Sequence, residues 1–447
     1  MAARAVALVI PPAPEGMSPN REGASGLGAL EPGAGGFRYP PQTTAQCAAG
    51  LRQVGIEPLL LDAPAMGWGV DETLARLQEA GPAIVALQVS WATADVDGAF
   101  CRDLRAALPE AARVAYGSAT RWVAPETLGS DVLLEGEPDL LLANVCRRLL
   151  SGETLPSVVE PGTHTGYDPE GYVDHLDGLP RPAWDLLPTE RYPFMTILSS
   201  RGCDHGCDWC PYAVAQGTRF RARSAESVVD ELAWLIETLA PKRIVLRDPV
   251  FARDRERVAA ICHGILRHGG LHPGRNLFWE CETRPDHLEA QLVRLMALAG
   301  CTAIKAGLET ADADLLVAHG RVADAQAAAA YLQRAASLAR ESANLGVAYR
   351  LYTMVGLPGQ TEESVRETAG FVTALRPHTL TCKPCKAYPG VSFRGALVAE
   401  DEVARQMGIM EQARSRLADL PQRSPSRWGR ALARRIYRLQ ARLSRRA

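Results

Sequence analysis

The first third of the chain alternates short apolar runs with segments whose apolar residues recur at helical spacing. We predict strands over residues 4–10, 57–63, 83–90, 112–118 and 131–137, with helices between them over 43–55, 70–81, 95–107 and 138–150. Nearly continuous apolar strands joined by helices indicate a parallel sheet that is covered on both faces. Residues 1–150 are therefore expected to form a doubly wound, Rossmann-like α/β domain, whose ligands bind beyond the carboxyl ends of the strands.

Two stretches near this domain lack such periodicity. Residues 18–42 are rich in glycine and proline and follow the first predicted strand. A loop of this length is typically either functional or disordered, and both interpretations stay open. Residues 151–190 carry many prolines and are predicted to be a linker between two domains.

A second alternating series follows the linker. Its predicted strands cover residues 194–200, 243–248, 277–283, 302–310, 346–359 and 379–390. A helix over 224–239 separates the first two strands, with Ser224 as its N-cap and an apolar stripe along one side. The βα units predict a partial (β/α)6 TIM barrel over residues 191–395, with its functional residues at the carboxyl ends of the strands.

Residues 396–447 are predicted to be a small helical region that ends in a basic tail. The tail places apolar residues on one side of a helix, among them Trp428, Leu432 and Ile436. Docking of this stripe onto the rest of the protein is one interpretation. Binding to an acidic partner or to a membrane surface is the other.

Composition narrows the class of protein. The chain has 447 residues, of which 47% are hydrophobic and 22% charged, and its formal net charge of -2 provides no basic field for nucleic acid. No apolar run reaches membrane-spanning length, so no transmembrane segment is expected. The apolar start of the chain stops at Pro11 without a signal-peptide cleavage site. We therefore expect a cytoplasmic protein whose 11 cysteines are reduced.

Three cysteines stand close together in the stretch RGCDHGCDWCPY, namely Cys203, Cys207 and Cys210. Cysteine thiolates hold the irons of iron–sulfur clusters, and three of them leave one iron of a cubane cluster open to another ligand. A zinc site would need a fourth ligand, for which only His205 is close, and we expect this side chain to face solvent. Incidental cysteines are the remaining alternative.

A second pair, Cys382 and Cys385, also has a spacing found in metal sites. An auxiliary cluster there would have to recruit the distant Cys281 or Cys301, so we expect core thiols instead. The metal chemistry of this sequence is therefore assigned to the three-cysteine stretch.

The spacing C-x-x-x-C-x-x-C after the first barrel strand, with the aromatic Trp209 before the last cysteine, resembles the signature of the radical S-adenosylmethionine (SAM) enzymes. The resemblance implies a [4Fe–4S] cluster whose open iron binds SAM. It also implies reductive cleavage of SAM to a 5′-deoxyadenosyl radical that takes hydrogen from a substrate. The stretches CPYAVAQGTRFRARSAESVVDEL, YTMVGLPGQTEES, RYPPQTTAQCAAGLRQVGIEPLLLDA and VLLEGEPD are similar to the branch with an N-terminal cobalamin-binding-type domain. This similarity covers residues 1–395.

By family position, the resemblance assigns five residues to SAM. Trp209 is expected near the adenine, and Glu309 and Thr310 near the ribose or the methionine part. Gly356 and Gly359 are expected to form a backbone wall against the adenine, although they could simply make a turn.

Two further residue assignments that the resemblance implies stay open. Glu309 could equally be a structural carboxylate paired with Arg350. A Gly-Gly-Glu-like run that grips the SAM amino group in the family is not evident, since the corresponding place reads LRDPVF. Whether Asp248 substitutes for it is open.

Polar residues near the strand ends are candidate substrate contacts, namely Asp248, Glu280, Glu282 and Lys305. Acidic groups would suit an amino-bearing or hydroxylated substrate, although Lys305 could instead pair with Glu280. Tyr212, two residues after the last cysteine, is the candidate catalytic residue, because its phenol could donate a hydrogen bond, a proton or a hydrogen atom. Packing is the alternative for this side chain.

The resemblance leaves two reactions open. No D-x-H-x-x-G stretch supplies a histidine to cobalt, which neither excludes nor supports cobalamin. In length and layout the chain resembles the radical SAM diol dehydratases of aminoglycoside biosynthesis, so radical dehydration of a sugar or aminoglycoside-type intermediate in antibiotic biosynthesis is preferred. The alternative is a cobalamin-dependent radical SAM C-methyltransferase, and an iron–sulfur electron carrier or sensor is a remote one. Either enzyme needs a small-molecule substrate and a flavodoxin- or ferredoxin-type reductant.

Overall fold

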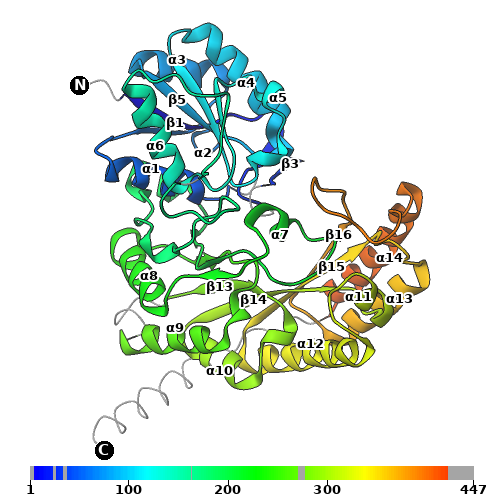
Figure 1. Ribbon diagram of the computed structural model, residues 1–447. Coiled ribbons are helices and arrows are strands. Elements are labelled where there is room, and N and C mark those ends of the chain that lie inside the picture. Colours follow the sequence, from blue (N-terminus) through cyan, green and yellow to red (C-terminus); the bar gives the residue numbers. More distant parts are fainter. Residues whose placement is uncertain (1–4, 24–26, 34–37, 163, 270–276, 421–447) are drawn as a thin grey trace, which may run out of the picture. The chain divides into compact units, whose positions relative to one another are not determined.

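The computed structural model describes residues 5–23, 27–33, 38–162, 164–269 and 277–420. The chain divides into two compact units, which are shown in Figure 1. The first unit comprises Met1–Thr196, Arg201–Cys203 and Pro211–Arg223. The second unit comprises Ile197–Ser200, Asp204–Cys210 and Ser224–Ala447.

The sheet of the first unit has the strand order β4-β1-β5-β6-β7-β8, and all neighbouring strands run parallel. Its strands are β1 (Val6–Ile10), β4 (Leu59–Asp62), β5 (Ile84–Gln88), β6 (Ala112–Tyr116), β7 (Val132–Leu134) and β8 (Val158–Val159). The chain passes from β1 to β4 on one side and then returns to β5 on the other. This reversal creates the switch point at which doubly wound sheets bind ligands, and the predicted doubly wound class is confirmed.

Helices cover both faces of this sheet, namely α1 (Gln42–Gln53), α2 (Ala63–Met66), α3 (Val70–Ala80), α4 (Ala94–Ala107), α5 (Pro125–Leu128) and α6 (Pro138–Leu150). Helix α1 packs beside α6, whereas α3, α4 and α5 follow one another, and Figure 1 shows these two groups on opposite sides of the strands. Alternation along β1 explains the two layers. Ala7 and Val9 join the core that contains Phe100 of α4. Leu8, between them, is buried on the other face.

Two parts of this unit differ from what the sequence predicts. Within residues 18–42, β2 (Met17–Asn20) and β3 (Ala29–Pro32) pair as an antiparallel hairpin. Within the predicted linker, residues 151–190, β8 adds an edge strand beside β7. Both elements are short and depend on partners elsewhere in the chain, so local periodicity does not mark them.

The sheet of the second unit has the strand order β9-β12-β13-β14-β15-β16, which follows the chain. Its strands are β9 (Met195–Ile197), β12 (Ile244–Leu246), β13 (Trp279–Thr283), β14 (Cys301–Glu309), β15 (Ala348–Val355) and β16 (Thr379–Pro384). The pairings from β12 to β16 are parallel. Parallel strands in chain order, each followed by helical structure, are the arrangement that the sequence predicts for the partial barrel.

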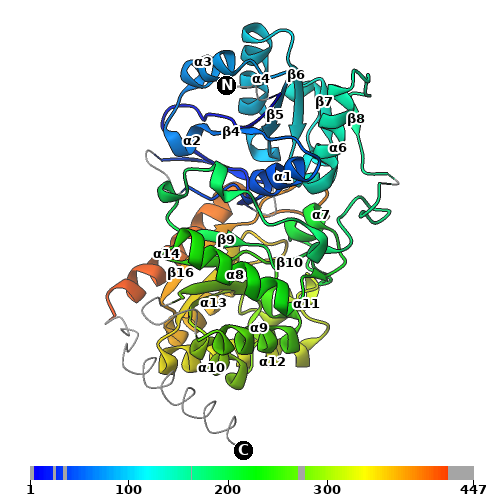
Figure 2. The ribbon, with the colours of Figure 1, turned by 90° about the vertical axis from the view of Figure 1, so that its left-hand side faces the viewer.

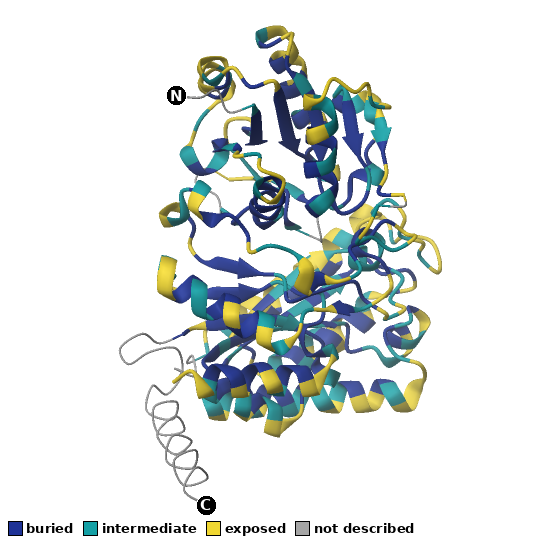
Figure 3. Cartoon of the chain, turned by 60° about the vertical axis from the view of Figure 1, so that its left-hand side comes forward, coloured by how far each residue is buried: buried dark blue, intermediate teal, exposed yellow. Residues whose placement is uncertain are grey.

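The helices of this unit are α8 (Ala225–Leu239), α9 (Arg255–Arg267), α10 (Ala290–Leu298), α11 (Ala313–Ala318), α12 (Ala325–Leu345), α13 (Glu362–Leu375) and α14 (Glu400–Ala418). Helices α8, α9, α10 and α12 follow one another side by side (Figure 2). Strands β9 and β12 are buried throughout, β14 and β15 alternate buried with half-buried residues, and the outward helix faces are exposed (Figure 3). Ser224 caps α8 as predicted, because its hydroxyl accepts a hydrogen bond from the N–H of Ser227 (3.1 Å).

The end of the chain is described only in part. Helix α14 lies within residues 396–447, which were predicted to be helical. The predicted basic tail falls in residues 421–447, outside the described residues. No helix of the described part is long and apolar enough to cross a membrane.

Candidate active site around the cysteine loop

The three predicted cluster ligands lie on one loop between β10 (Ser200–Arg201) and α7 (Pro211–Gln216). Cys203 is buried, whereas Cys207 and Cys210 are partly accessible. Among the residues that the structure describes, no three Cys, His, Asp or Glu side chains converge on one metal position. The fit to an iron–sulfur cluster therefore rests on the donor set, which is three closely spaced thiols on one irregular loop.

Backbone contacts of the first unit fix the start of this loop. The N–H of Cys203 donates to the carbonyl of Gly217 (3.1 Å). Gly202 has a φ of 75°, and a Cβ at this position would lie 2.1 Å from the carbonyl oxygen of Arg219. Only glycine fits this turn without displacing the backbone. After the loop, Tyr212 is the second residue of α7 and is half-buried, and its catalytic role stays a prediction.

A buried carboxylate of the second unit fixes the chain directly before the loop. Asp248, which follows β12, accepts hydrogen bonds from the N–H of Ser199 (2.7 Å) and from the hydroxyls of Ser199 and Ser200 (2.7 Å for Ser200). Arg257 of α9 donates to the carbonyl of Ser199 (2.6 Å). Asp248 is fully buried, so these contacts give it a positioning role. Its contact with SAM or substrate stays a prediction.

In the first unit, two carboxylates hold arginines that flank the cysteine loop in sequence. Arg201 forms a bidentate ion pair with Asp139 (2.7 and 2.8 Å), and Arg221 of β11 (Arg221–Ala222) forms one with Glu137 (both 2.9 Å). All four side chains are buried. Burial acts to raise the pKa of Glu137, but the charges of Arg201 and Arg221 outweigh it and hold this pKa below its usual value. No local sequence pattern marks this network, because its members are distant in the chain.

The second half of the loop is held by His319. Its Nδ1 lies 3.0 Å from Oδ2 of Asp208, and its Nε2 lies 2.9 Å from the carbonyl oxygen of Pro358. Both partners are acceptors, so a ring nitrogen of His319 that carries a hydrogen can donate to the partner it faces. Trp209 is buried and packs edge-on against His319, with ring centroids 5.8 Å apart. The indole is thus fixed in the second unit, and its contact with adenine stays a prediction.

A buried arginine that the sequence analysis missed also contacts the loop. Nη1 of Arg321 lies 3.7 Å from the sulfur of Cys207, and its Nη2 lies 3.6 Å from Oε1 of Glu309. Its Nε donates to the phenol oxygen of Tyr331 in α12 (3.1 Å). No local motif marks Arg321, because only the fold brings it to the cysteine.

The predicted SAM residue Glu309 ends β14 in an unusual conformation. Its φ of 69° is in the left-handed region, which costs a non-glycine residue about 1–3 kcal/mol. Burial raises the pKa of its carboxyl group, and the charge of Arg321 opposes this shift. The structural alternative expected a pair with Arg350, which instead contacts Glu280 (2.8 Å). A strained backbone beside a buried ion pair is a common feature of functional sites.

The other three residues assigned to SAM have packing contacts of their own. The hydroxyl of Thr310 lies 3.1 Å from that of Thr368 in α13. Gly356 has a φ of 80°, and its N–H donates to the side-chain oxygen of Gln406 in α14 (2.9 Å). Gly359 has a φ of 79°. These contacts position the loops after β14 and β15, and the proximity to SAM stays a prediction.

The remaining candidate substrate residues form an ion network. Glu280 is the second residue of β13, at the beginning of the strand, and pairs with Arg243 (3.0 Å) and Arg350 (2.8 Å). Lys305 lies 3.4 Å from Glu282 and 3.9 Å from Glu280, so the pairing that the sequence left open does occur. Substrate contacts by these residues stay predictions.

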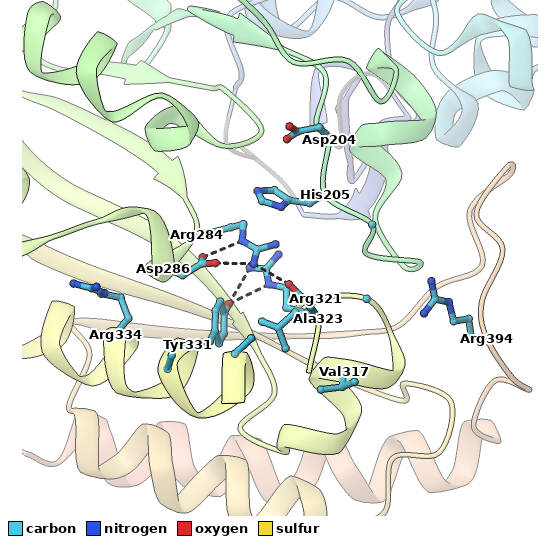
Figure 4. Close-up of a pocket in the computed structure, with 15 residues that line it drawn as sticks. Asp204, His205, Arg284, Asp286, Val317, Arg321, Ala323, Tyr331, Arg334 and Arg394 are labelled. Carbon is cyan, nitrogen blue, oxygen red and sulfur yellow. Dashed lines mark hydrogen bonds and ion pairs between the residues drawn. The ribbon is translucent and has the colours of Figure 1, made fainter. Parts of the chain in front are cut away.

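An open hollow of about 710 Å³ lies beside the cysteine loop within the second unit (Figure 4). Its charged and polar lining consists of Asp204, His205, Arg284, Asp286, Arg321, Tyr331, Arg334 and Arg394. Arg284 pairs with Asp286 (2.8 Å) and donates to the carbonyl of Arg321 (2.8 Å). Figure 4 shows these side chains gathered at the centre of the hollow with Tyr331. The hollow is therefore rich in cationic groups.

His205 lies on this hollow, whereas the sequence analysis expected it to face solvent. It is half-buried, and its Nε2 lies 3.0 Å from Nε2 of His287. Burial and the charge of Arg284 lower the pKa of His205 to about 3. Burial lowers the pKa of His287 to about 4. Both rings are therefore neutral at pH 7. Local sequence could not predict their contact, because His287 is distant from His205 in the chain.

The second cysteine pair, which was predicted to consist of core thiols, is only half-buried in the structure, because it lies at the edge strand β16 and directly after it. Burial raises the pKa of Cys382 to about 11 and that of Cys385 to about 12. Thiolate is the form that binds metal, and these shifts disfavour it.

A second hollow, of about 360 Å³, lies in the first unit at the carboxyl ends of β1, β4 and β5. Ile10, Asp62 and Gln88, which end these strands, belong to its lining. Gly67 and Gly69 line it as well, and a Cβ at either position would meet nothing within 4 Å. The hollow thus occupies the switch point of the sheet and leaves backbone open to a ligand.

Residues 197–372 match the family model described as the radical SAM superfamily. This part of the chain is therefore a radical SAM domain, as the cysteine spacing predicts. The cofactors of such a domain are a [4Fe–4S] cluster and SAM.

The relatives and solved structures described below are distant from this chain in sequence. An uncharacterized methyltransferase of Pyrococcus horikoshii is 24% identical over 270 residues, which are 58% of this chain and 56% of that protein. The chain thus spans about half the length of this relative. The radical SAM methyltransferase TsrM from Kitasatospora setae was solved with tryptophan and a SAM analogue, and it matches with a TM-score of 0.66 at 19% identity. This match covers 85% of the present chain and 73% of the TsrM chain. The cobalamin-dependent SAM radical enzyme OxsB matches with a TM-score of 0.62 at 15% identity. This match covers 94% of the present chain and 57% of the OxsB chain.

At these identities the two solved structures show the fold alone. The Pyrococcus relative and TsrM both carry the name methyltransferase. Closeness to the diol dehydratases, which the sequence analysis preferred, is not shown.

Proposed function

We propose that this protein is a cobalamin-dependent radical SAM methyltransferase that acts on a small metabolite. The observation that carries the proposal is the three-thiol loop with buried Arg321 beside Cys207, in a radical SAM domain whose chain has a TsrM-like fold along 85% of its length. The methyltransferase relatives support methylation over dehydration.

The cluster and SAM would supply a 5′-deoxyadenosyl radical, and cobalamin would supply a transferable methyl group. Cys203, Cys207 and Cys210 would hold three irons and leave the fourth for SAM. Arg321 is buried beside Cys207 and offers the charge that the SAM carboxylate needs. Trp209 would give the adenine an apolar flank.

The doubly wound domain fits a corrinoid that takes no histidine from this domain. Residues 1–150 contain no histidine, so none of them can ligate cobalt through imidazole. The hollow at the switch point combines polar side chains such as Asp62 and Gln88 with open backbone at Gly67 and Gly69. Such a lining suits a large ligand whose periphery carries amide groups.

The ligand assignment is tested by Cys203→Ala, Cys207→Ala and Cys210→Ala after anaerobic reconstitution. Each variant is expected to lose most of its cluster iron and visible absorbance, and all SAM cleavage, because each removes one iron ligand. Cys382→Ala is the matched control and is expected to keep both. SAM cleavage that survives in any of the three variants would refute the assignment.

The reaction is tested by supplying cobalamin, SAM and a reductant to the anaerobic protein. Products from candidate small metabolites are then analysed by mass spectrometry. Methylated product together with S-adenosylhomocysteine and 5′-deoxyadenosine is expected. A dehydrated product that forms equally well without corrinoid would overturn methylation and restore the dehydratase alternative.

A further inference from the structure

The hollow beside the cysteine loop carries more positive charge than one SAM carboxylate requires. Its ionised lining residues are four arginines against two aspartates, a net charge of +2, in a chain whose formal net charge is -2. A local cationic field on a nearly neutral protein attracts anionic partners.

The two aspartates of the hollow do not cancel the remaining charge, because each already has an arginine. Asp204 pairs with Arg253 (2.6 Å). Asp286 pairs with Arg284 (2.8 Å). Both carboxylates are therefore neutralised locally.

Two arginines of the hollow, Arg334 and Arg394, are available for an ion pair with a partner. Arg334 on α12 is half-exposed, and Arg394, which follows β16, is exposed. Neither guanidinium makes an ion pair within the described ranges. The Arg394 guanidinium donates to the carbonyl of Ala318 (3.3 Å), and the backbone N–H of this residue donates to the carboxylate of Asp208 (2.9 Å). Figure 4 shows them on two sides of the hollow, on separate elements.

One side chain connects this hollow with a cluster ligand. Arg321 lines the hollow, and its Nη1 lies 3.7 Å from the sulfur of Cys207. Asp204, His205 and Gly206, which precede this cysteine on the loop, line the hollow as well. A partner seated on the hollow would therefore stand directly beside the cluster loop.

We propose that this hollow is the docking site of a small acidic one-electron carrier protein, a flavodoxin or a ferredoxin. The proposal rests on the proposed function, because it requires a redox-active cluster at the cysteine loop. In each transfer the reduced carrier loses one electron and the oxidised cluster gains it. Complementary charge across such an interface mainly accelerates association, and this effect weakens as salt increases.

The test uses the reconstituted holoprotein and the charge-reversal variant Arg334→Glu/Arg394→Glu. The rate of cluster reduction is followed by stopped-flow absorbance, first with reduced flavodoxin and then with dithionite. The matched control is Arg366→Glu/Arg414→Glu, which changes the net charge equally at arginines that do not line the hollow.

We expect the Arg334/Arg394 variant to lower the second-order rate constant with flavodoxin by about tenfold or more at low salt, the scale of electrostatic steering. Rising salt should reduce the difference from the wild type. Dithionite should reduce both proteins equally, and the control should behave as the wild type does.

Three results would overturn the docking site: an unchanged rate with flavodoxin, an equal loss in the control, or an equal loss with dithionite. A wild-type protein that accepts electrons from dithionite but none from either carrier would also overturn it, while leaving the proposed function intact. A protein that holds no reducible cluster would instead remove the proposed function and the docking site together.

Discussion

Asp248 accepts three hydrogen bonds in the interior of the second unit, all from the two serines that precede the cysteine loop. The carboxylate is fully buried, so water cannot replace a lost acceptor. A buried donor left without a partner costs about 1–3 kcal/mol. The position of the loop therefore depends on an acidic side chain that lies outside the cysteine motif.

Asp248→Asn tests this dependence. The amide offers one acceptor oxygen instead of two, so we expect the free energy of unfolding to fall by about 1–3 kcal/mol and cluster iron per chain to fall with it. Asp254→Asn is the control, because Asp254 caps α9 and asparagine caps helices equally well. Iron analysis and urea unfolding check both variants. Full iron content in a destabilised Asp248→Asn protein would contradict the positioning role.

Glu137 makes the stability of the first unit depend on pH. Its folded-state pKa is held below the unfolded value, which is about 4.3 for glutamate. A depressed carboxyl pKa contributes stability that is fully present above the unfolded pKa and is lost as pH falls through the folded pKa. We expect the unfolding free energy to fall more steeply below about pH 4.3 in the wild type than in Glu137→Gln.

Urea unfolding from pH 7 to the acid range provides the measurement. Glu137→Gln should be less stable at pH 7 by about 3–5 kcal/mol, because it leaves Arg221 buried beside a neutral group. Glu137→Gln/Arg221→Met removes both charges and should recover part of the loss. Parallel pH curves for the wild type and Glu137→Gln would exclude Glu137 as a titrating group.

At the scale of elements, the hairpin β2–β3 is tied to helix α4 of the first unit by a buried ion pair. The guanidinium of Arg21, directly after β2, contacts the carboxylate of Asp97 in α4, and both side chains are almost completely buried. Glu22 in turn accepts hydrogen bonds from Thr43 (3.0 Å) and Gln88 (2.7 Å). These contacts order a glycine-rich stretch that has no core of its own.

Arg21→Met should therefore loosen the hairpin, because it leaves Asp97 buried without its partner, at a cost of about 3–5 kcal/mol. Limited proteolysis is expected to cut the variant within residues 17–33 faster than the wild type. Arg21→Met/Asp97→Asn removes both charges and should restore much of the protection. Equal cutting of the wild type and Arg21→Met would show that the ion pair does not order the hairpin.

The same contrast between local and distant contacts explains how much the sequence could predict. Strands such as β1 and β5 are continuous apolar runs, and Ser224 caps α8 through a residue three positions away, so local pattern suffices for them. The hairpin and β8 depend on partners elsewhere in the chain. In the site, the cysteine spacing is local and predictable. Arg321 and the pair of Glu137 with Arg221 are not, because folding alone brings them to the loop.

At the scale of the whole molecule, the proposed function requires that the first unit bind a corrinoid at the switch point of its sheet. A ligand that binds only the folded protein stabilises it by about 2.7 kcal/mol when its concentration is 100 times the dissociation constant. Hydroxocobalamin should therefore raise the melting temperature of the protein and remain bound through gel filtration. This stabilisation provides a measure of binding that is independent of turnover.

Gly69→Trp tests the location of the corrinoid. Gly69 lines the hollow, has an ordinary φ of -83° and leaves space in which a Cβ would meet nothing within 4 Å, so an indole can occupy the hollow without backbone strain. The variant should fold, keep its cluster and cleave SAM, but lose the corrinoid absorbance and the rise in melting temperature. Gly178→Trp is the matched control, because Gly178 is equally open and does not line the hollow. Corrinoid retained by Gly69→Trp, or lost equally by both variants, would place the cofactor elsewhere.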